Sequence, residues 1–202
     1  MICIFANGLY EGELDFSCCE KIVAVDGGAN FLRLRKIIPD FFIGDADSVE
    51  NETMDWLRKN NVEMKLYPSE KDEIDLELAL EFFKDEEKIV FGWQGERLDM
   101  ILALFYLLKR FKNTVLESEN LTVGYVEGRM ILRARVGEKW SILPLGGDAT
   151  GVTLKGFKYT LKDAKMPILK PYGVSNVAIS NEVEIEVREG GVIYFRWKKE
   201  PS

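Results

Sequence analysis

Short apolar runs alternate with helical patterns along the first 125 residues of the chain. The runs are rich in Ile, Val and Phe, and they predict strands at 2–6, 21–25, 41–43, 62–67, 88–92 and 113–118. Between them, apolar positions recur with helical spacing at about 28–36, 51–60, 73–84 and 96–111. Alternation of this kind predicts an α/β fold, with a mainly parallel sheet and helices on both of its faces.

The pattern changes after residue 129, where short strands and turns follow one another without a helical repeat. The strands are predicted within 130–136, 140–146, 151–161 and 177–197. Residues 182–187 alternate strictly between glutamate and apolar positions, and "REGG" (188–191) predicts a turn that completes a hairpin with 192–197. The sequence therefore predicts two domains, an α/β domain at 1–125 and a small antiparallel β domain at 126–202.

Composition and charge exclude several classes of partner. The chain has 202 residues, of which 47% are hydrophobic and 30% charged, and this balance is typical of a globular protein. A net charge of −7 argues against general nucleic-acid binding, which needs a basic surface. The apolar run at 100–108 is too short to cross a membrane, and the N-terminus has no signal-peptide pattern. We therefore expect neither nucleic acid nor a membrane as a partner.

The chain contains no histidine, which excludes Ser-His triads and histidine metal sites. Its cysteines are Cys3, Cys18 and Cys19, and we expect this odd set to form neither a disulfide framework nor a zinc knuckle. A reducing cytoplasm is the expected location. Any chemistry must then depend on carboxylates, hydroxyls, lysine, arginine and backbone amides.

Acidic residues follow four predicted strands, at the positions where an open parallel sheet binds its ligands. Asp26 precedes Gly27 and Gly28, whose amides can approach a phosphate at a helix N-terminus. Further along the chain come Asp45 with Asp47, Asp72 with Asp75 on the predicted first turn of a helix, and Arg97 with Asp99.

Each of these acids also fits a structural role, because Asp favours turns and helix N-termini. Asp45 and Asp47 are either turn residues or metal ligands, with Ser48 the expected cap of the following helix. Converging carboxylates would repel one another unless a cation were bound, and a magnesium-bound polyphosphate would supply one. The set of acids therefore favours metal-phosphate chemistry.

Four motifs support this hypothesis: "DGGAN" (26–30), "PDFFIGDADS" (39–48), "KDEIDLELAL" (71–80) and "GERLDM" (95–100). In this order and spacing they resemble the motif set of the thiamin pyrophosphokinase family. The resemblance continues through "SILPLG" (141–146), "VTLKGFKYTL" (152–161) and "GVSN" (173–176). It implies that the pyrophosphoryl group of ATP is transferred to the hydroxyl of thiamin, giving thiamin diphosphate and AMP.

The resemblance also implies a homodimer, an α/β domain that binds ATP, and a C-terminal β-sandwich that contributes to the thiamin pocket. Carried over residue by residue, it assigns Mg²⁺ to Asp45, Asp47, Asp75 and Asp99. These four residues and Asp72 form the expected catalytic set, with the general base among Asp72, Asp75 and Asp99. The expected nucleotide contacts are Asp26, Gly27, Gly28, Asn30, Gly44, Lys71, Gly95 and Arg97, and the expected thiamin contacts are Ser175 and Asn176.

Three positions depart from the family pattern. Ile74 stands where the family has threonine, Met100 where it has histidine, and Val177 where glutamate or threonine is common. Two alternatives therefore stay open beside the thiamin enzyme. One is a diphosphokinase of the same fold that acts on another hydroxymethyl acceptor, such as a pterin. The other is a non-catalytic module that binds thiamin or nucleotide.

Overall fold

The computed structural model describes residues 1–199, and the chain divides into two compact units. Unit 1 comprises Met1–Ile101 with Leu116–Ser118, and unit 2 comprises Leu102–Val115 with the residues from Glu119 onward. Helix α4 (Leu98–Arg110) and strand β6 (Thr114–Glu117) contain residues of both units. Within the described residues, no helix combines the length and the apolar character that a membrane span requires.

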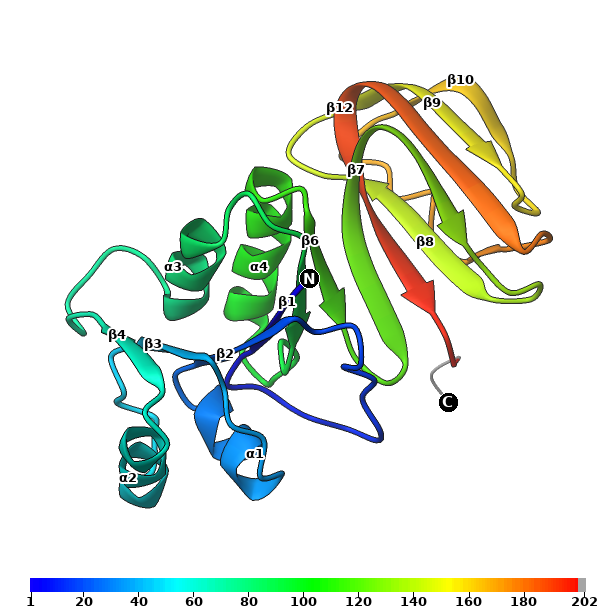
Figure 1. Ribbon diagram of the computed structural model, residues 1–202. Coiled ribbons are helices and arrows are strands. Elements are labelled where there is room, and N and C mark those ends of the chain that lie inside the picture. Colours follow the sequence, from blue (N-terminus) through cyan, green and yellow to red (C-terminus); the bar gives the residue numbers. More distant parts are fainter. Residues whose placement is uncertain (200–202) are drawn as a thin grey trace. The chain divides into compact units, whose positions relative to one another are not determined.

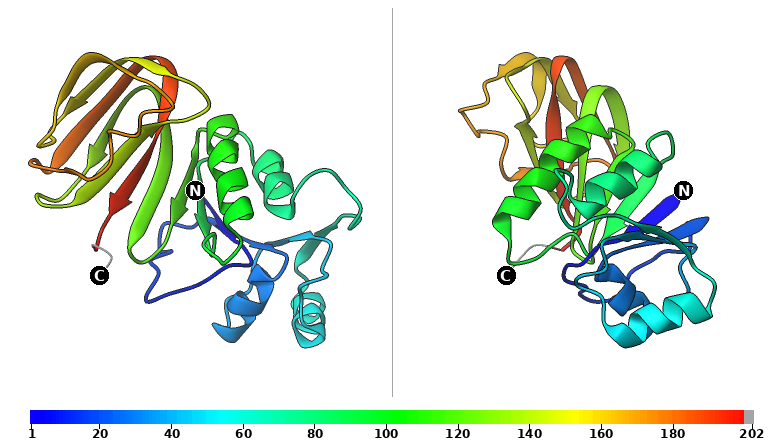
Figure 2. Two further views of the ribbon diagram at one scale, coloured as in Figure 1. Left: turned by 180° about the vertical axis from the view of Figure 1, so that it is seen from behind. Right: turned by 90° about the vertical axis from the view of Figure 1, so that its left-hand side faces the viewer.

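Unit 1 is a parallel sheet with helices on both sides. Its strands are β1 (Ile2–Phe5), β2 (Lys21–Val25), β3 (Phe41–Gly44), β4 (Glu63–Leu66) and β5 (Lys88–Phe91), in the spatial order β5-β1-β2-β3-β4. Helices α1 (Gly28–Leu34) and α2 (Asn51–Lys59) lie on one side of this sheet, and α3 (Asp75–Phe82) lies on the other (Figures 1 and 2). The α/β prediction is confirmed, and these elements end within about two residues of their predicted bounds.

The core of unit 1 explains why its strands are short apolar runs. Phe5, Phe42 and Phe91 are fully buried on β1, β3 and β5, and Leu32 and Leu57 pack in the same core from α1 and α2. A parallel sheet covered on both faces buries successive side chains and not alternate ones, so near-continuous apolar runs are expected. The four strand residues Ile2–Phe5 are all buried, in agreement with that rule.

Unit 2 is built mainly from antiparallel strands. They are β7 (Leu121–Arg133), β8 (Lys139–Pro144), β9 (Ala149–Lys155), β10 (Leu161–Met166), β11 (Asn176–Val177) and β12 (Glu182–Trp197). Both halves of β12 pair with β7, while its first half also pairs with β9 and its second half with β8. Trp140, Phe157 and Ile185 are fully buried in the core of this unit. Long strands that bend to serve two sheets are typical of a β-sandwich, and the predicted fold class is confirmed.

The predicted hairpin at 188–191 is wrong. β12 runs through this segment as one strand, with a shift of register between Val187 and Val192. Gly190 takes a φ of +79°, which suits the irregular residues of a bulge as well as those of a turn. Because 182–187 and 192–197 both pair with the continuous strand β7, they cannot pair with each other.

The division into units differs from the boundary predicted at residue 125. β7 continues across that position without interruption, because its partner β12 offers hydrogen bonds along both of its halves. The compact units also place the part of the chain from Leu102 to Val115 with the antiparallel strands.

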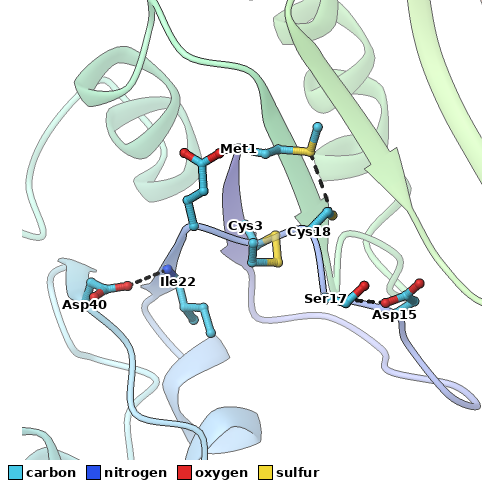
Figure 3. The surroundings of a disulfide bond; sticks show 9 residues. Met1, Cys3, Asp15, Ser17, Cys18, Ile22 and Asp40 are labelled. Carbon is cyan, nitrogen blue, oxygen red and sulfur yellow. Dashed lines mark hydrogen bonds and ion pairs between the residues drawn. A yellow bond between two sulfur atoms is a disulfide. The ribbon is translucent and has the colours of Figure 1, made fainter.

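The expectation of no disulfide is also wrong. Cys3 on β1 and Cys19 just before β2 form one, with their Cα atoms 5.5 Å apart (Figure 3). Strands β1 and β2 are parallel neighbours, so Cys3 near the start of β1 and Cys19 just before β2 lie at the same end of the sheet. Cys18 is a free, exposed thiol. The cysteines therefore no longer support the prediction of a reducing compartment.

Candidate active site

Three carboxylates meet where β2 and β3 end. Asp26 follows β2, and Asp45 and Asp47 follow β3. The two strands are parallel neighbours with Val25 opposite Ile43, so the residues after them reach the same edge of the sheet. One oxygen of each carboxylate lies within 4.8 Å of the others. This group of three acids was predicted in part, since the sequence assigned Asp45 and Asp47 to metal and Asp26 to the nucleotide.

Asp26 is the buried member of the group. Only 7% of the residue is exposed, and burial raises the pKa of its carboxyl group. Its backbone N–H donates to the carbonyl of Ile43 at 3.0 Å, and its φ of +44° is left-handed. Among the described residues, no hydrogen-bond partner reaches Oδ1 of Asp26. A buried carboxylate oxygen without a partner is unfavourable, and a bound cation would satisfy it.

The segment from Asp45 to Ser48 folds back on itself. The N–H of Asp47 donates to Oδ1 of Asp45 at 3.1 Å across Ala46, which has a φ of +66°. This hydrogen bond is the largest of the effects that lower the pKa of Asp45. Oγ of Ser48 donates to Oδ1 of Asp47 at 2.8 Å. The segment thus presents both carboxylates at the edge of the sheet.

Ser48 does not cap the following helix, so that prediction is wrong. The N-cap of α2 is Glu50, and its side chain makes no capping hydrogen bond. Asn30 of α1 fixes the loop that leads into α2. Its Nδ2 donates to the carbonyl of Ser48 at 3.0 Å, and its Oδ1 accepts from the N–H of Glu50 at 3.1 Å. Asn30 was predicted as a nucleotide contact, and here both ends of its amide position the loop that follows Asp47.

Lys71 connects the group of three acids to a fourth acid. Its Nζ lies 3.6 Å from Oδ2 of Asp45 and 3.1 Å from Oδ1 of Asp75, and it donates to the carbonyl of Pro68 at 2.9 Å. A cation between two carboxylates reduces their repulsion. Asp75 begins α3, whereas Asp72 is exposed and precedes the helix. The expectation that Asp72 and Asp75 share the first helical turn is therefore wrong.

Arg97 and Asp99 pair with each other and are not part of the group of three acids. Nε of Arg97 donates to Oδ1 of Asp99 at 3.2 Å, and a second, shorter contact joins the guanidinium to Oδ2. Both side chains are more than half exposed, at 71% and 65%. Gly95, just before them, has open space where a side chain would project. A ligand would have access to all three residues.

Gly28 is required by close packing against backbone, whereas Gly27 lies against the flexible end of the Asn7 side chain. A Cβ on Gly27 would lie 2.2 Å from Oδ1 of Asn7, and one on Gly28 would lie 2.0 Å from the carbonyl oxygen of Phe5. The N–H groups of Ala29 and Asn30 already donate to the carbonyls of Asp26 and Gly27. The predicted role of the two glycines in phosphate binding stays a prediction. Gly44 lies beside them, where a Cβ would approach that of Asp26 within 3.2 Å.

Unit 2 holds the two residues predicted to contact thiamin. Asn176 is buried, and its side-chain amide accepts from Tyr159 N–H at 3.0 Å and donates to the Tyr159 carbonyl at 2.8 Å. Ser175 is exposed, has a φ of +61°, and donates its N–H to Oγ of Ser141 at 3.2 Å. Asn176 therefore stabilises the local backbone, while Ser175 is accessible to a ligand.

Sequence reasoning missed Asn7. Its side chain lies against Gly27, at the end of β1 next to the acids, but no acid or glycine pattern marks it. The three carboxylates offer only oxygen ligands, which suit a hard divalent cation such as Mg²⁺. The unpartnered oxygen of Asp26 agrees with that assignment.

Carboxylates at the carboxyl edge of a parallel sheet, beside a lysine, are typical of enzymes that handle metal-bound phosphate. Comparison with known proteins agrees with this class. Residues 14–118 match the family description "Thiamin pyrophosphokinase, catalytic domain", and residues 130–192 match "Thiamin pyrophosphokinase, vitamin B1 binding domain". The chain belongs to the thiamin pyrophosphokinase family, as its motifs predicted.

Individual relatives support the assignment. The chain is 26% identical over 183 residues to a thiamine pyrophosphokinase of Bacillus subtilis, with 86% of each chain covered. The crystal structure of a thiamine pyrophosphokinase from Bacillus subtilis superposes with a TM-score of 0.85 at 23% identity, covering 98% of this chain and 99% of that one. A yeast thiamin pyrophosphokinase structure gives 0.78 at 15% identity, covering 96% and 85%. These structural likenesses concern the fold.

Proposed function

We propose that the chain transfers the pyrophosphoryl group of ATP to the hydroxyl of thiamin, giving thiamin diphosphate and AMP. One observation carries the proposal: three carboxylates within 4.8 Å of one another, at the sheet edge, in a chain of this family. The family match does not favour a pterin as acceptor, nor a module without turnover.

In this proposal Asp26, Asp45 and Asp47 hold Mg²⁺, and the group offers the oxygen ligands that this ion prefers. When bound, the ion offsets negative charge on the polyphosphate during transfer. Asp75 and Asp99 complete the predicted set of ligands. Asp75 is paired with Lys71, and Asp99 is paired with Arg97. For either carboxylate to bind the metal ion, its basic partner would have to turn toward the phosphates.

The remaining residues of the site position the substrates. Lys71 and Arg97 supply positive charge for the phosphates, and Asn30 keeps the loop after Asp47 in place. Attack by the thiamin hydroxyl on the β-phosphorus releases AMP, and one of the carboxylates of Asp72, Asp75 and Asp99 accepts the hydroxyl proton. Asp72 is exposed, so its carboxylate is accessible to a substrate.

Thiamin carries a fixed positive charge, and an acidic site attracts such an acceptor. We place its contacts at Ser175 and Asn176, and we expect the side chain of Ser175 to be the more available of the two. Ile74 and Met100 lack the polar groups of the family pattern, so acceptor binding depends on other contacts. The proposal includes a homodimer, which the family resemblance implies, and a cytoplasmic location, which was predicted from the cysteines alone.

The experiment that tests the proposal measures AMP released from ATP in the presence of Mg²⁺ and thiamin. Asp45→Asn and Asp47→Asn should each reduce the rate by at least about 100-fold, the scale of losing one group that stabilises developing charge. The matched control is Asp55→Asn, which changes an acid that is 81% exposed on α2 and pairs only with Arg58 among the described residues. AMP formed with a hydroxymethyl pterin and not with thiamin would show that the acceptor is wrong, and no turnover at all would refute the enzyme.

A further inference from the structure

Three cysteine sulfurs and a thioether gather at the amino-terminal end of the sheet in unit 1. The Sγ atoms of Cys3, Cys18 and Cys19 lie within 4.8 Å of one another. The Sδ atom of Met1 lies 4.0 Å from Sγ of Cys18, and Figure 3 shows both residues beside the disulfide. We call this set the sulfur cluster. It is separate from the three carboxylates, which lie where β2 and β3 end.

The disulfide explains only part of this cluster. Cys3 and Cys19 need each other to form it, but Cys18 takes no part and is exposed. Its sulfur nevertheless lies within the same 4.8 Å limit and approaches the thioether of Met1. The exposed side chain of Cys18 could point into solvent at little cost in free energy. It instead lies beside the Cys3–Cys19 disulfide and adds a third sulfur there.

The sulfur ligands of the cluster prefer a different class of metal ion from the carboxylate oxygens. Thiolate and thioether ligands select soft cations such as Cu(I), whereas carboxylates suit Mg²⁺. The chain contains no histidine that could supply nitrogen ligands in competition. We propose that Cys3, Cys18 and Cys19, with the thioether of Met1 beside them, form a binding site for one soft monovalent cation of the Cu(I) class when the disulfide is reduced.

The reduced state follows by a balanced step. A dithiol reductant gives two electrons and two protons to the disulfide, so the reductant becomes a disulfide and Cys3 and Cys19 become thiols. Cation binding then releases protons from the thiols that ligate it. Sulfur ligands about 2.3 Å from one metal ion lie about 4 Å apart, so the Sγ atoms of Cys3 and Cys19 must move apart once the disulfide is reduced.

The geometry also connects the cluster to the loop that follows β1. The segment between Cys3 and Cys19 includes Asn7 and Gly8, which contact Gly27 and Gly92 at the carboxyl end of the sheet. Either the disulfide or a bound cation would fix the other end of this segment. The cation site is therefore an alternative to the disulfide in holding the segment to the sheet.

The test titrates Cu(I) into dithiothreitol-reduced, desalted protein without oxygen, against a coloured Cu(I) chelator and in excess Mg²⁺. The excess Mg²⁺ prevents binding at the carboxylates from contributing. Reduced wild-type chain should withdraw one Cu(I) from the chelator. Loss of a residue that only contacts a metal ligand weakens metal binding by roughly 10–100-fold. Cys18→Ser removes a ligand itself, so it should weaken Cu(I) binding by more than that. The oxidised chain, with two of its sulfurs bonded to each other, should withdraw none.

Ser17→Ala is the matched control, because it changes the residue next to Cys18 without removing a sulfur, and it should bind like the wild type. Circular dichroism before titration verifies that each variant is folded. The proposal is overturned if the reduced chain leaves Cu(I) on the chelator. It is equally overturned if Cys18→Ser or the oxidised chain binds as tightly as the reduced wild type. Because AMP formation is not measured, these results are independent of the proposed enzyme activity.

Discussion

Loss of the Cys3–Cys19 disulfide should destabilise unit 1 by about 3 kcal/mol. The cysteines are separated by 16 positions, and closing a loop of that size removes conformational entropy from the unfolded chain worth about 3 kcal/mol. Cys3 is fully buried on β1, so the loop is closed onto the sheet itself. Substituting Cys19, which is partly exposed, removes the bond with little loss of packing.

The assay is urea unfolding followed by far-UV circular dichroism, which responds mainly to the helices. For a slope of about 1–3 kcal/mol per molar urea, the loss lowers the midpoint by about 1–3 M. Oxidised wild type should unfold at the highest urea concentration. Cys19→Ser should unfold near reduced wild type, and dithiothreitol should not change its midpoint.

Cys18→Ser is the control, because it removes a neighbouring thiol and leaves the disulfide intact. Its midpoint should equal that of oxidised wild type and fall when dithiothreitol is added. Equal midpoints for oxidised wild type and Cys19→Ser would refute the reasoning, since the bond would then contribute nothing to stability. A fall in Cys18→Ser without reductant would also refute it, because the free thiol would then be the stabilising group.

Three other predictions test separate parts of the chain. Gly28→Ala should lower the free energy of unfolding of unit 1 by about 2 kcal/mol or more, because the new Cβ would lie 2.0 Å from the Phe5 carbonyl oxygen. Gly95→Ala is the control: its Cβ would meet nothing within 4 Å, so the urea midpoint should stay unchanged. Burial acts to raise the pKa of Glu138, but hydrogen bonds from Arg196 and the Arg135 amide outweigh it and lower the pKa below the ordinary value of 4.5. The ionised carboxylate therefore stabilises the fold above that pH, and this contribution is lost as the pH falls through the lowered pKa. Glu138→Gln should therefore lower the free energy of unfolding at neutral pH, and the difference from wild type should disappear when unfolding is measured at falling pH. Lys71→Met should strengthen binding of Mn²⁺ without nucleotide by about tenfold, because it removes a cation that lies between Asp45 and Asp75; electron paramagnetic resonance measures free Mn²⁺, and unchanged binding would contradict this account.

Much of unit 1 could be predicted because local signals and tertiary structure agree there. The run at 21–25 is β-branched and apolar, and it forms β2 with the predicted bounds. Asp45 and Asp47 were expected at one sheet edge from the rule for strand ends alone, and parallel register brings them there. The rule predicts which residues reach the edge but not their partners, so the position of Lys71 between two acids could not be predicted.

The hairpin and the disulfide were missed for one shared cause, since each depends on a partner that is distant in sequence. "REGG" fits a turn or a bulge, and the long pairing with β7 decides for the bulge. Cys3 and Cys19 come to the same end of the sheet only because β1 pairs with β2. Ser48 has the right chemistry for a cap, but its hydroxyl donates to Asp47 instead. A single sequence does not contain the two strand pairings.

The acid group shows how a fold can retain a site that does not stabilise it. Asp26 is buried with an oxygen that lacks a partner, and burial favours the uncharged form of its carboxyl group. Asp45, by contrast, is stabilised as a carboxylate by the amide of Asp47 and by Lys71. The chain thus tolerates neighbouring acids by giving each a different environment, with Lys71 reducing the repulsion between Asp45 and Asp75. Hydrogen bonds between Asn30 and the loop after Asp47 hold this arrangement in place, so the carboxylates are positioned before any cation arrives.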